Sequence, residues 1–211
     1  MVYVTYIIIG ITVLVSLQAF NSHAIFAKLL NNPYQVKHRH EYYRILSHTL
    51  IHADYLHLGF NMFALYSFGR FTEEYFTYTY GNLKGEIAYI LLYVCGAVVA
   101  TLPSLRKHGD NYGYNSVGAS GAVSAVMMAA MIIMPVMKVY FFFAIGMPAY
   151  IAILVFFGFE HYMNRSGKSN IAHDAHIWGA IFGLVFVICL DFEIIKNAIA
   201  LISKYPWGIP N

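Results

Sequence analysis

The sequence predicts an all-α, polytopic membrane protein, a bundle of about six transmembrane helices in a single domain over residues 1–211. Of the 211 residues, 59% are hydrophobic and only 11% are charged, whereas a soluble domain carries about 25% charged residues. Apolar runs also recur along the chain at about the 20-residue length that crosses a bilayer. These runs use most of the chain, which leaves no room for a separate soluble domain.

Six apolar runs define the expected spans. They lie at about 3–20, 55–74, 86–103, 119–136, 148–162 and 172–190. The segments between them hold most of the Asn and charged residues, as loops between spans do. The first run lacks a basic leader and a small-residue cleavage motif, so we expect a retained helix rather than a signal peptide.

Two connecting segments differ from ordinary loops. Residues 21–54 are too polar to span a membrane, yet their apolar residues recur at helical spacing, which predicts an amphipathic first loop in the interface. The run from Lys138 to Met147 is apolar but follows Pro135. We interpret it as a re-entrant or interfacial connector; the alternative is a longer, kinked fifth span.

Charge and cysteine usage exclude some functions. The net charge is +3 and the basic residues are scattered, so there is no electrostatic footprint for nucleic acid. Cys95 and Cys189 lie in apolar runs without CxxC spacing. They are therefore interpreted as small core side chains.

Three polar clusters lie near the start of the second, fourth and sixth expected spans. They are His57 with Asn61, the run 118–121, and His176. Spans that alternate in direction bring these three starts to the same membrane face. Polar residues inside a membrane are energetically expensive, so these clusters are the first candidates for a functional site.

The residue types suggest how each cluster could act. His57 and Asn61 are four residues apart, so they share one helix face and can donate hydrogen bonds to the same point. Ser120 opens the fourth span, where free backbone N–H groups could stabilise an oxyanion, although Ser there is also a common helix cap.

The sixth span carries small residues on the face of its histidine. Gly179 and Gly183 share that face with His176. Small residues let membrane helices approach closely, and the fourth span offers a matching small face. We therefore expect His176 to lie within reach of Ser120, although such glycine spacing is also common in purely structural helix contacts.

Together these residues resemble the rhomboid family of intramembrane serine proteases. The family motifs read here as His57-Leu-Gly-Phe-Asn61, Gly118-Ala-Ser120-Gly121 and Ala175-His176-Ile-Trp-Gly179-Ala-Ile-Phe-Gly183, and the similarity extends to the run Arg44 to His52 and to Glu73. The resemblance implies a six-helix rhomboid-like bundle that cleaves single-pass transmembrane substrates in the lipid bilayer. It implies a Ser120–His176 dyad, oxyanion stabilisation by His57 and Asn61, and no metal or cofactor.

Two positions depart from the family pattern. Tyr43 precedes Arg44 where the family commonly has Trp, and Ser124 stands where the family often has a Tyr that stacks on the catalytic His. No acidic third member is evident, because Asp174, two residues before His176, lies on a different helix face. The expected machinery is therefore a dyad without a carboxylate.

Two other functions compete with this interpretation. The ten histidines include His48 and His52 at ligand-like spacing, and His57, His173 and His176 besides, so a metal-dependent membrane protein is one alternative. No HExxH motif supports it. The other alternative is a non-proteolytic rhomboid-like protein that binds membrane clients.

The expected cellular location and orientation of the protein rest on the family resemblance more than on the distribution of Lys and Arg. Eight Lys and Arg residues lie on the side of the polar clusters and five on the other, which would place the clusters in the cytoplasm. Four of the eight belong to the interfacial first segment, so we follow the family's usual bacterial arrangement. The expectation is a bacterial inner membrane protein whose active site opens to the extracytoplasmic side.

Overall fold

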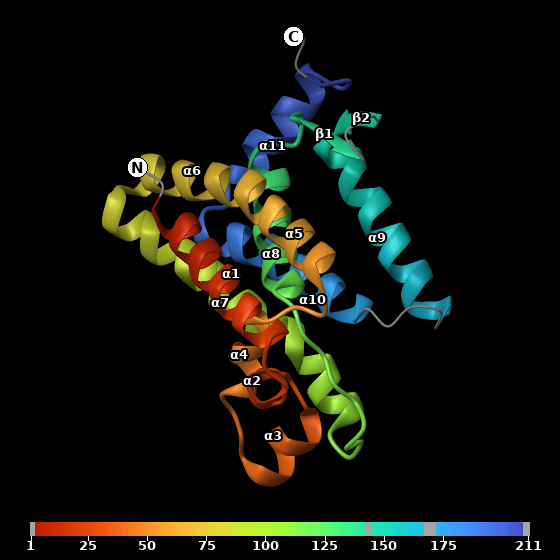
Figure 1. The fold of residues 1–211 in the computed structure, drawn as a ribbon. Coiled ribbons are helices and arrows are strands. Elements are labelled where there is room, and N and C mark those ends of the chain that lie inside the picture. The colour runs from red at the N-terminus through yellow and green to blue at the C-terminus, as the bar shows by residue number, and fades with distance from the viewer. Residues whose placement is uncertain (1–2, 142–144, 167–171, 209–211) are drawn as a thin grey trace.

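The computed structural model describes residues 3–141, 145–166 and 172–208. Its main elements are long helices, which form a bundle with α8 at the centre (Figure 1). They are α1 (Val4–Phe20), α5 (Tyr55–Ala64), α6 (Arg70–Tyr80), α7 (Asn82–His108), α8 (Ser120–Ile133), α9 (Ala149–Ser166), α10 (His173–Leu190) and α11 (Glu193–Lys204).

Helices occupy all six apolar runs of the sequence. The second run is divided between α5 and α6, joined by a π-helical turn, η2 (Leu65–Gly69). The third run lies within α7, a longer helix than expected, which begins at Asn82 and continues to His108. Among the described residues, α7 and α10 are long and apolar enough to cross a membrane, and α1 and α8 are shorter apolar helices.

The segment after α8 departs from the all-α prediction. It forms an antiparallel hairpin of β1 (Lys138–Phe141) and β2 (Ile145–Pro148), with Lys138 opposite Pro148. The alternative of a longer, kinked fifth span is therefore wrong, and the connector is a hairpin. Val, Tyr and Phe favour strands. Gly146 pairs with Tyr140, and a Cβ there would lie 2.9 Å from the Tyr140 ring, so glycine leaves room for that ring across the hairpin.

The first loop is a lobe of short helices rather than one amphipathic segment. It contains α2 (His23–Leu29), α3 (Pro33–Arg39), α4 (Arg44–Ser47) and a 3₁₀ turn, η1 (His48–Leu50). The buried Arg44 holds the lobe together: its Nη1 donates to the carbonyls of Ala27 and Leu30, and its Nε donates to Glu41 at 2.6 Å. This contact lowers the pKa of the Glu41 carboxyl.

Helix α11 lies beyond the last apolar run and was not predicted. Ile194 and Ala198 are buried on one side, whereas Phe192 and Ile199 are exposed. The bundle therefore continues into a short amphipathic helix that packs on α8.

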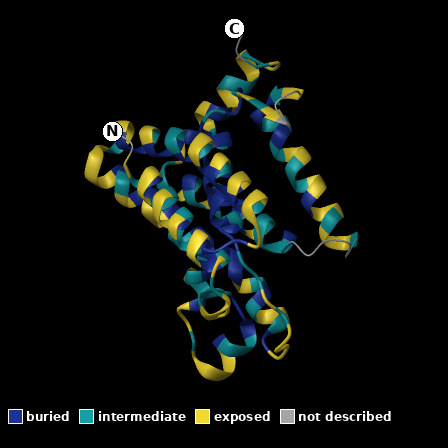
Figure 2. Cartoon of the chain, viewed as in Figure 1, coloured by how far each residue is buried: buried dark blue, intermediate teal, exposed yellow. Residues whose placement is uncertain are grey.

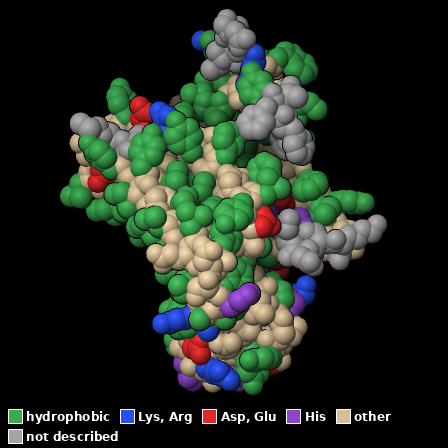
Figure 3. Space-filling model, in the orientation of Figure 1, with side chains coloured by type: hydrophobic (Ala, Val, Ile, Leu, Met, Phe, Trp, Pro, Cys, Tyr) green, Lys and Arg blue, Asp and Glu red, His purple; other side chains and the backbone are tan. Residues whose placement is uncertain are grey.

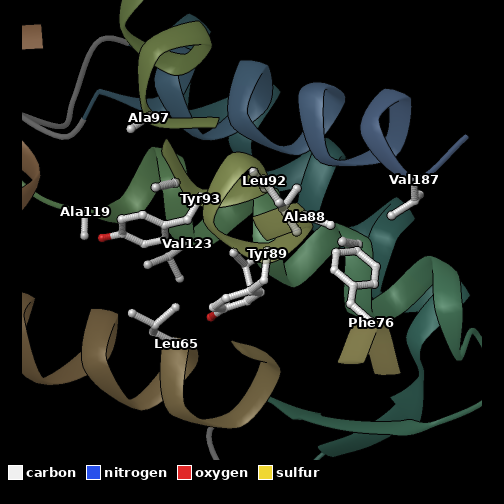
Figure 4. Close-up of a cluster of buried hydrophobic side chains, with 14 of the residues drawn as sticks. Leu65, Phe76, Ala88, Tyr89, Leu92, Tyr93, Ala97, Ala119, Val123 and Val187 are labelled. Carbon is white, nitrogen blue, oxygen red and sulfur yellow. The ribbon is translucent and has the colours of Figure 1, made fainter. Parts of the chain in front are cut away.

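Helix α8 supplies the centre of the core. Burial is concentrated on it and on the helix faces turned towards it (Figure 2). Tyr89 and Leu92 of α7, Phe76 of α6 and Leu65 of η2 are fully buried around Val123 of α8 (Figure 4). Small residues, chiefly Ala and Ser, make up much of α8 and allow its neighbours to pack closely.

Glu73 joins α1 to α6 through a buried carboxylate. It is 0% exposed and accepts hydrogen bonds from the backbone N–H groups of Tyr3, Val4 and Thr5, each at 2.8 Å, and from the Thr5 hydroxyl at 2.6 Å. The first N–H groups of a helix have no partner within it, and the helix dipole favours negative charge there. Glu73 therefore fixes the start of α1 against the bundle.

The outer surface is unusually apolar. Lys, Arg and His gather on the lobe of α2–α4, whereas hydrophobic side chains cover much of the visible bundle above it (Figure 3). Leu14, Leu56 and Leu154 are 64%, 69% and 70% exposed. Large exposed apolar surfaces are typical of contact with lipid or a partner rather than with water.

Candidate functional site

The close approach of α8 and α10 builds the site. A Cβ at Gly179 would collide with the carbonyl oxygen of Gly121, and a Cβ at Gly183 would collide with that of Ala125. Only glycine permits this separation, because real Cβ atoms essentially never come closer than 3.0 Å to another heavy atom. The glycine-lined face of α10 thus lies directly against the backbone of α8.

This packing brings His176 to Ser120. The His176 Nε2 atom lies 2.7 Å from the Ser120 Oγ atom, within hydrogen-bond distance. Ser120 is the first residue of α8 and is partly buried, as is His176. A hydroxyl held on an imidazole nitrogen at a helix start, where the first N–H groups have no partner within the helix, has the elements needed for nucleophilic catalysis.

A carboxylate that sequence reasoning missed lies behind His176. Glu160 of α9 places Oε1 3.0 Å from His176 Nδ1 and Oε2 2.6 Å from His173 Nδ1. Its side chain is only 7% exposed. The sequence did indicate Glu160 itself, since a lone carboxylate in an apolar run is a functional candidate. It did not indicate the two histidines as its partners, because they lie 13 and 16 residues away in the chain.

These three side chains form a group that could hold a metal ion, but their spacing here is that of hydrogen bonds. Their ligand atoms lie within 4.8 Å of one another, but two ligands of tetrahedral zinc lie about 3.3 Å apart at usual bond lengths. The Glu160–His173 and Glu160–His176 separations, 2.6 and 3.0 Å, are shorter than that and fit direct hydrogen bonds. His48 and His52, the pair with ligand-like spacing, lie instead at the turn before Ser120 and make hydrogen bonds there.

His48 and His52 brace the turn that precedes Ser120. The Gly118 N–H donates to the His48 carbonyl at 2.9 Å, and the Ala119 N–H donates to His52 Nε2 at 3.3 Å. Burial lowers the pKa of His48 to about 4 and the pKa of His52 to about 3. Both first-loop histidines are therefore neutral, and His52 serves as an acceptor for the backbone of this turn.

His57 lies against the same turn. Gly118 has φ +114°, and a Cβ there would lie 2.8 Å from His57 Nε2. The Ala53 N–H points at His57 Nδ1 over a long 3.5 Å contact, which favours the tautomer with its proton on Nε2. His57 thereby presents a donor towards the turn before Ser120.

Asn61 is buried one helical turn beyond His57. Its Nδ2 donates to the His57 carbonyl at 2.9 Å, and an amide nitrogen has two hydrogens, so one stays available. All four residues singled out in the sequence thus lie on α5, α8 and α10, and α8 packs against both of the other helices.

A small cavity of about 30 Å³ adjoins Ser120. Polar side chains from η1, α7 and the turn before α8 line it, among them Thr49, Thr101 and Ser116. A site of this size with several polar groups can hold a water molecule. Ser124 is buried one turn further along α8; the ring beside His176 is instead that of His173, edge-on with centroids 5.9 Å apart.

Comparisons with known proteins identify the family of this chain. The rhomboid domain family model matches residues 39–191. The Arabidopsis thaliana protein named RHOMBOID-like protein 12, mitochondrial, is 30% identical over 145 residues, which are 63% of this chain and 43% of the relative. Rhomboid protease GluP of Bacillus subtilis (strain 168) is 27% identical over 143 residues, 68% of this chain and 25% of the relative.

The chain spans less than half the length of these two relatives. The family match, however, covers well over half of the 211 residues and includes each of the helices that carry the site. The chain therefore belongs to the rhomboid family and is, as members of that family are, an integral membrane protein.

Proposed function

We propose that this protein is an intramembrane serine endopeptidase in which Ser120 is the nucleophile and His176 its general base. The observation that carries the proposal is the 2.7 Å separation of Ser120 Oγ and His176 Nε2. General base catalysis requires that distance, and helix packing rather than a flexible loop maintains it.

The reaction is an acyl transfer in two halves. His176 Nε2 takes the hydroxyl proton as Ser120 Oγ forms a bond to the peptide carbonyl carbon. The tetrahedral intermediate collapses, the C–N bond breaks, and His176 gives its proton to the leaving nitrogen. Water then attacks the acyl-enzyme, passing a proton to His176, which returns it to Ser120 Oγ as the new carboxylic acid leaves.

The oxyanion formed in each half needs donors. The Ser120 backbone N–H, the second Nδ2 hydrogen of Asn61 and the Nε2–H of His57 are the groups we assign to it. Removing one such donor typically slows catalysis by about 100- to 1,000-fold. The water-sized cavity beside Ser120 supports delivery of the hydrolytic water to the site.

Substrate and topology follow from the same proposal. Six spans, formed by α1, α5–α6, α7, α8, α9 and α10, would place the site near the N-terminal ends of α5, α8 and α10, close to one membrane face. The substrates we expect are single-pass membrane proteins whose transmembrane segment unwinds beside Ser120. A bacterial inner membrane with an extracytoplasmic site remains our assignment, and the mitochondrial name of one relative makes the compartment a matter for experiment.

The test is cleavage of a single-pass substrate by purified protein in liposomes. Ser120→Ala and His176→Ala should each abolish cleavage, whereas Ser203→Ala on the distant α11 should not alter it. Cleavage should persist with a chelator, since no step uses a metal. Loss of activity with chelator would favour the metal-dependent alternative, and a folded wild type that cleaves no substrate would favour a client-binding protein.

A further inference from the structure

We propose that Glu160 is a positioning residue for the reaction, so that Ser120, His176 and Glu160 act as a triad. Its carboxylate would hold His176 in the tautomer and orientation that general base catalysis needs. This inference rests on the proposed function and adds to it a residue from α9, the helix that lies to one side of the bundle (Figure 1).

The tautomer of His176 follows from the chemistry of its two neighbours. A neutral imidazole has one N–H and one lone pair, and a carboxylate can only accept. His176 Nδ1 lies 3.0 Å from Glu160 Oε1, so the ring proton resides on Nδ1. The lone pair is then on Nε2, 2.7 Å from the Ser120 hydroxyl. This is the form that can take a proton from Ser120.

Glu160 is itself held in place by a second histidine. His173 Nδ1 lies 2.6 Å from Oε2 of Glu160, so each carboxylate oxygen has one N–H donor. A carboxylate with a side chain only 7% exposed requires such partners. His173 Nε2 is buried without a hydrogen-bond partner among the described residues. A lone pair without a partner is tolerated there better than an N–H, which agrees with a His173 ring that carries its proton on Nδ1 and donates it to Glu160.

The charge of Glu160 also matters after proton transfer. When His176 has taken the Ser120 proton it is a cation, and a carboxylate 3.0 Å away stabilises it more strongly in a site shielded from water. Ser124, one turn beyond Ser120, offers no ring to pack on His176. His176 instead contacts the Glu160 carboxylate and the edge of the His173 ring.

A structural role is the competing explanation, because the same contacts also join α9 to α10. Kinetics separate the two roles. Loss of positioning lowers kcat with little change in KM, whereas a displaced helix α9 that only weakens substrate binding raises KM and leaves kcat unchanged.

The experiment compares Glu160→Gln, Glu160→Asp and wild type in liposomes. It measures kcat and KM for a single-pass substrate and the rate at which a fluorophosphonate labels Ser120. We expect Glu160→Gln to lower kcat and the labelling rate by about 100- to 10,000-fold, the usual contribution of general base catalysis. Glu160→Asp keeps the charge and should retain more of kcat than Glu160→Gln. His161→Gln, an exposed neighbour on α9, is the matched control and should behave as wild type.

The outcomes distinguish the two proposals. If cleavage and labelling depend on Ser120 but Glu160→Gln matches wild type, or changes KM alone, the positioning role is wrong and the proposed protease function stands. If wild type is neither active nor labelled while folded, the protease function fails and the role of Glu160 fails with it.

Discussion

Substitution of Gly179 by Ala tests the helix contact on which the whole site depends. The added Cβ would collide with the carbonyl oxygen of Gly121, a backbone atom that cannot rotate away. The only relief is for α10 to move away from α8. His176 lies one turn before Gly179 on the same helix, so it must move as well.

The size of the effect follows from the geometry. A Cβ needs at least 3.0 Å from another heavy atom, so we expect α10 to shift by about 1 Å. The separation of Ser120 Oγ and His176 Nε2 would then grow from 2.7 Å to about 3.7 Å, beyond hydrogen-bond range. A 1 Å misplacement can reduce rate by about 100-fold. Overpacking should also lower the free energy of unfolding by about 1–3 kcal/mol.

The assay is kcat/KM for cleavage of a single-pass substrate, with thermal stability measured on the same preparations. Gly158→Ala is the control, because a Cβ at Gly158 on α9 has no atom within 4 Å. A Gly179→Ala protein that cleaves as fast as wild type would refute the reasoning, since it would mean that the α8–α10 contact does not set the distance between Ser120 and His176.

Three further predictions concern the surroundings of the site. Glu73→Ala leaves several buried donors at the start of α1 unpaired and should lower the free energy of unfolding by about 3–5 kcal/mol, whereas Glu74→Ala, at an exposed position, should change it by less than about 0.5 kcal/mol. Burial lowers the pKa of His48 to about 4 from 6.5, so the unfolded chain takes up that proton first and stability falls as pH drops from 6.5 towards 4. Between pH 7 and pH 5 the free energy of unfolding, measured by denaturation, should fall by about 2 kcal/mol more in wild type than in His48→Asn. An unchanged pH dependence would mean that His48 is not buried in its neutral form. Gly118→Ala forces a side chain into a left-handed conformation against the His57 ring, which should destabilise by about 1–3 kcal/mol and lower kcat, and a fully active variant would contradict the role of this turn.

The helices could be predicted from the sequence because burial in lipid imposes a simple pattern. An apolar run must satisfy its backbone hydrogen bonds internally, and a helix is the economical way to do so. The positions of α1, α8 and α10 follow directly from their runs. The hairpin between α8 and α9 could not be predicted in the same way, because a short apolar run bounded by prolines suits a strand or a connector equally well.

Residues of the candidate site could be predicted where their neighbours in the sequence form a recognisable pattern. Ser120 is adjacent to glycine at a helix start, and His176 shares a face with Gly179 and Gly183, so each is conspicuous within a few residues of sequence. Glu160 could not be assigned to the site in this way, because nothing near it in the chain indicates which residue it faces.

The sequence by itself predicted the apolar helices, the family and the proposed residues Ser120 and His176, because hydropathy, glycine spacing and short motifs are local properties. Only the tertiary structure decided that His176 has a carboxylate behind it. That pairing depends on how α9 and α10 approach each other, and such an approach is fixed by packing between residues distant in the chain. The predicted dyad is thereby extended by a contact that no local pattern records.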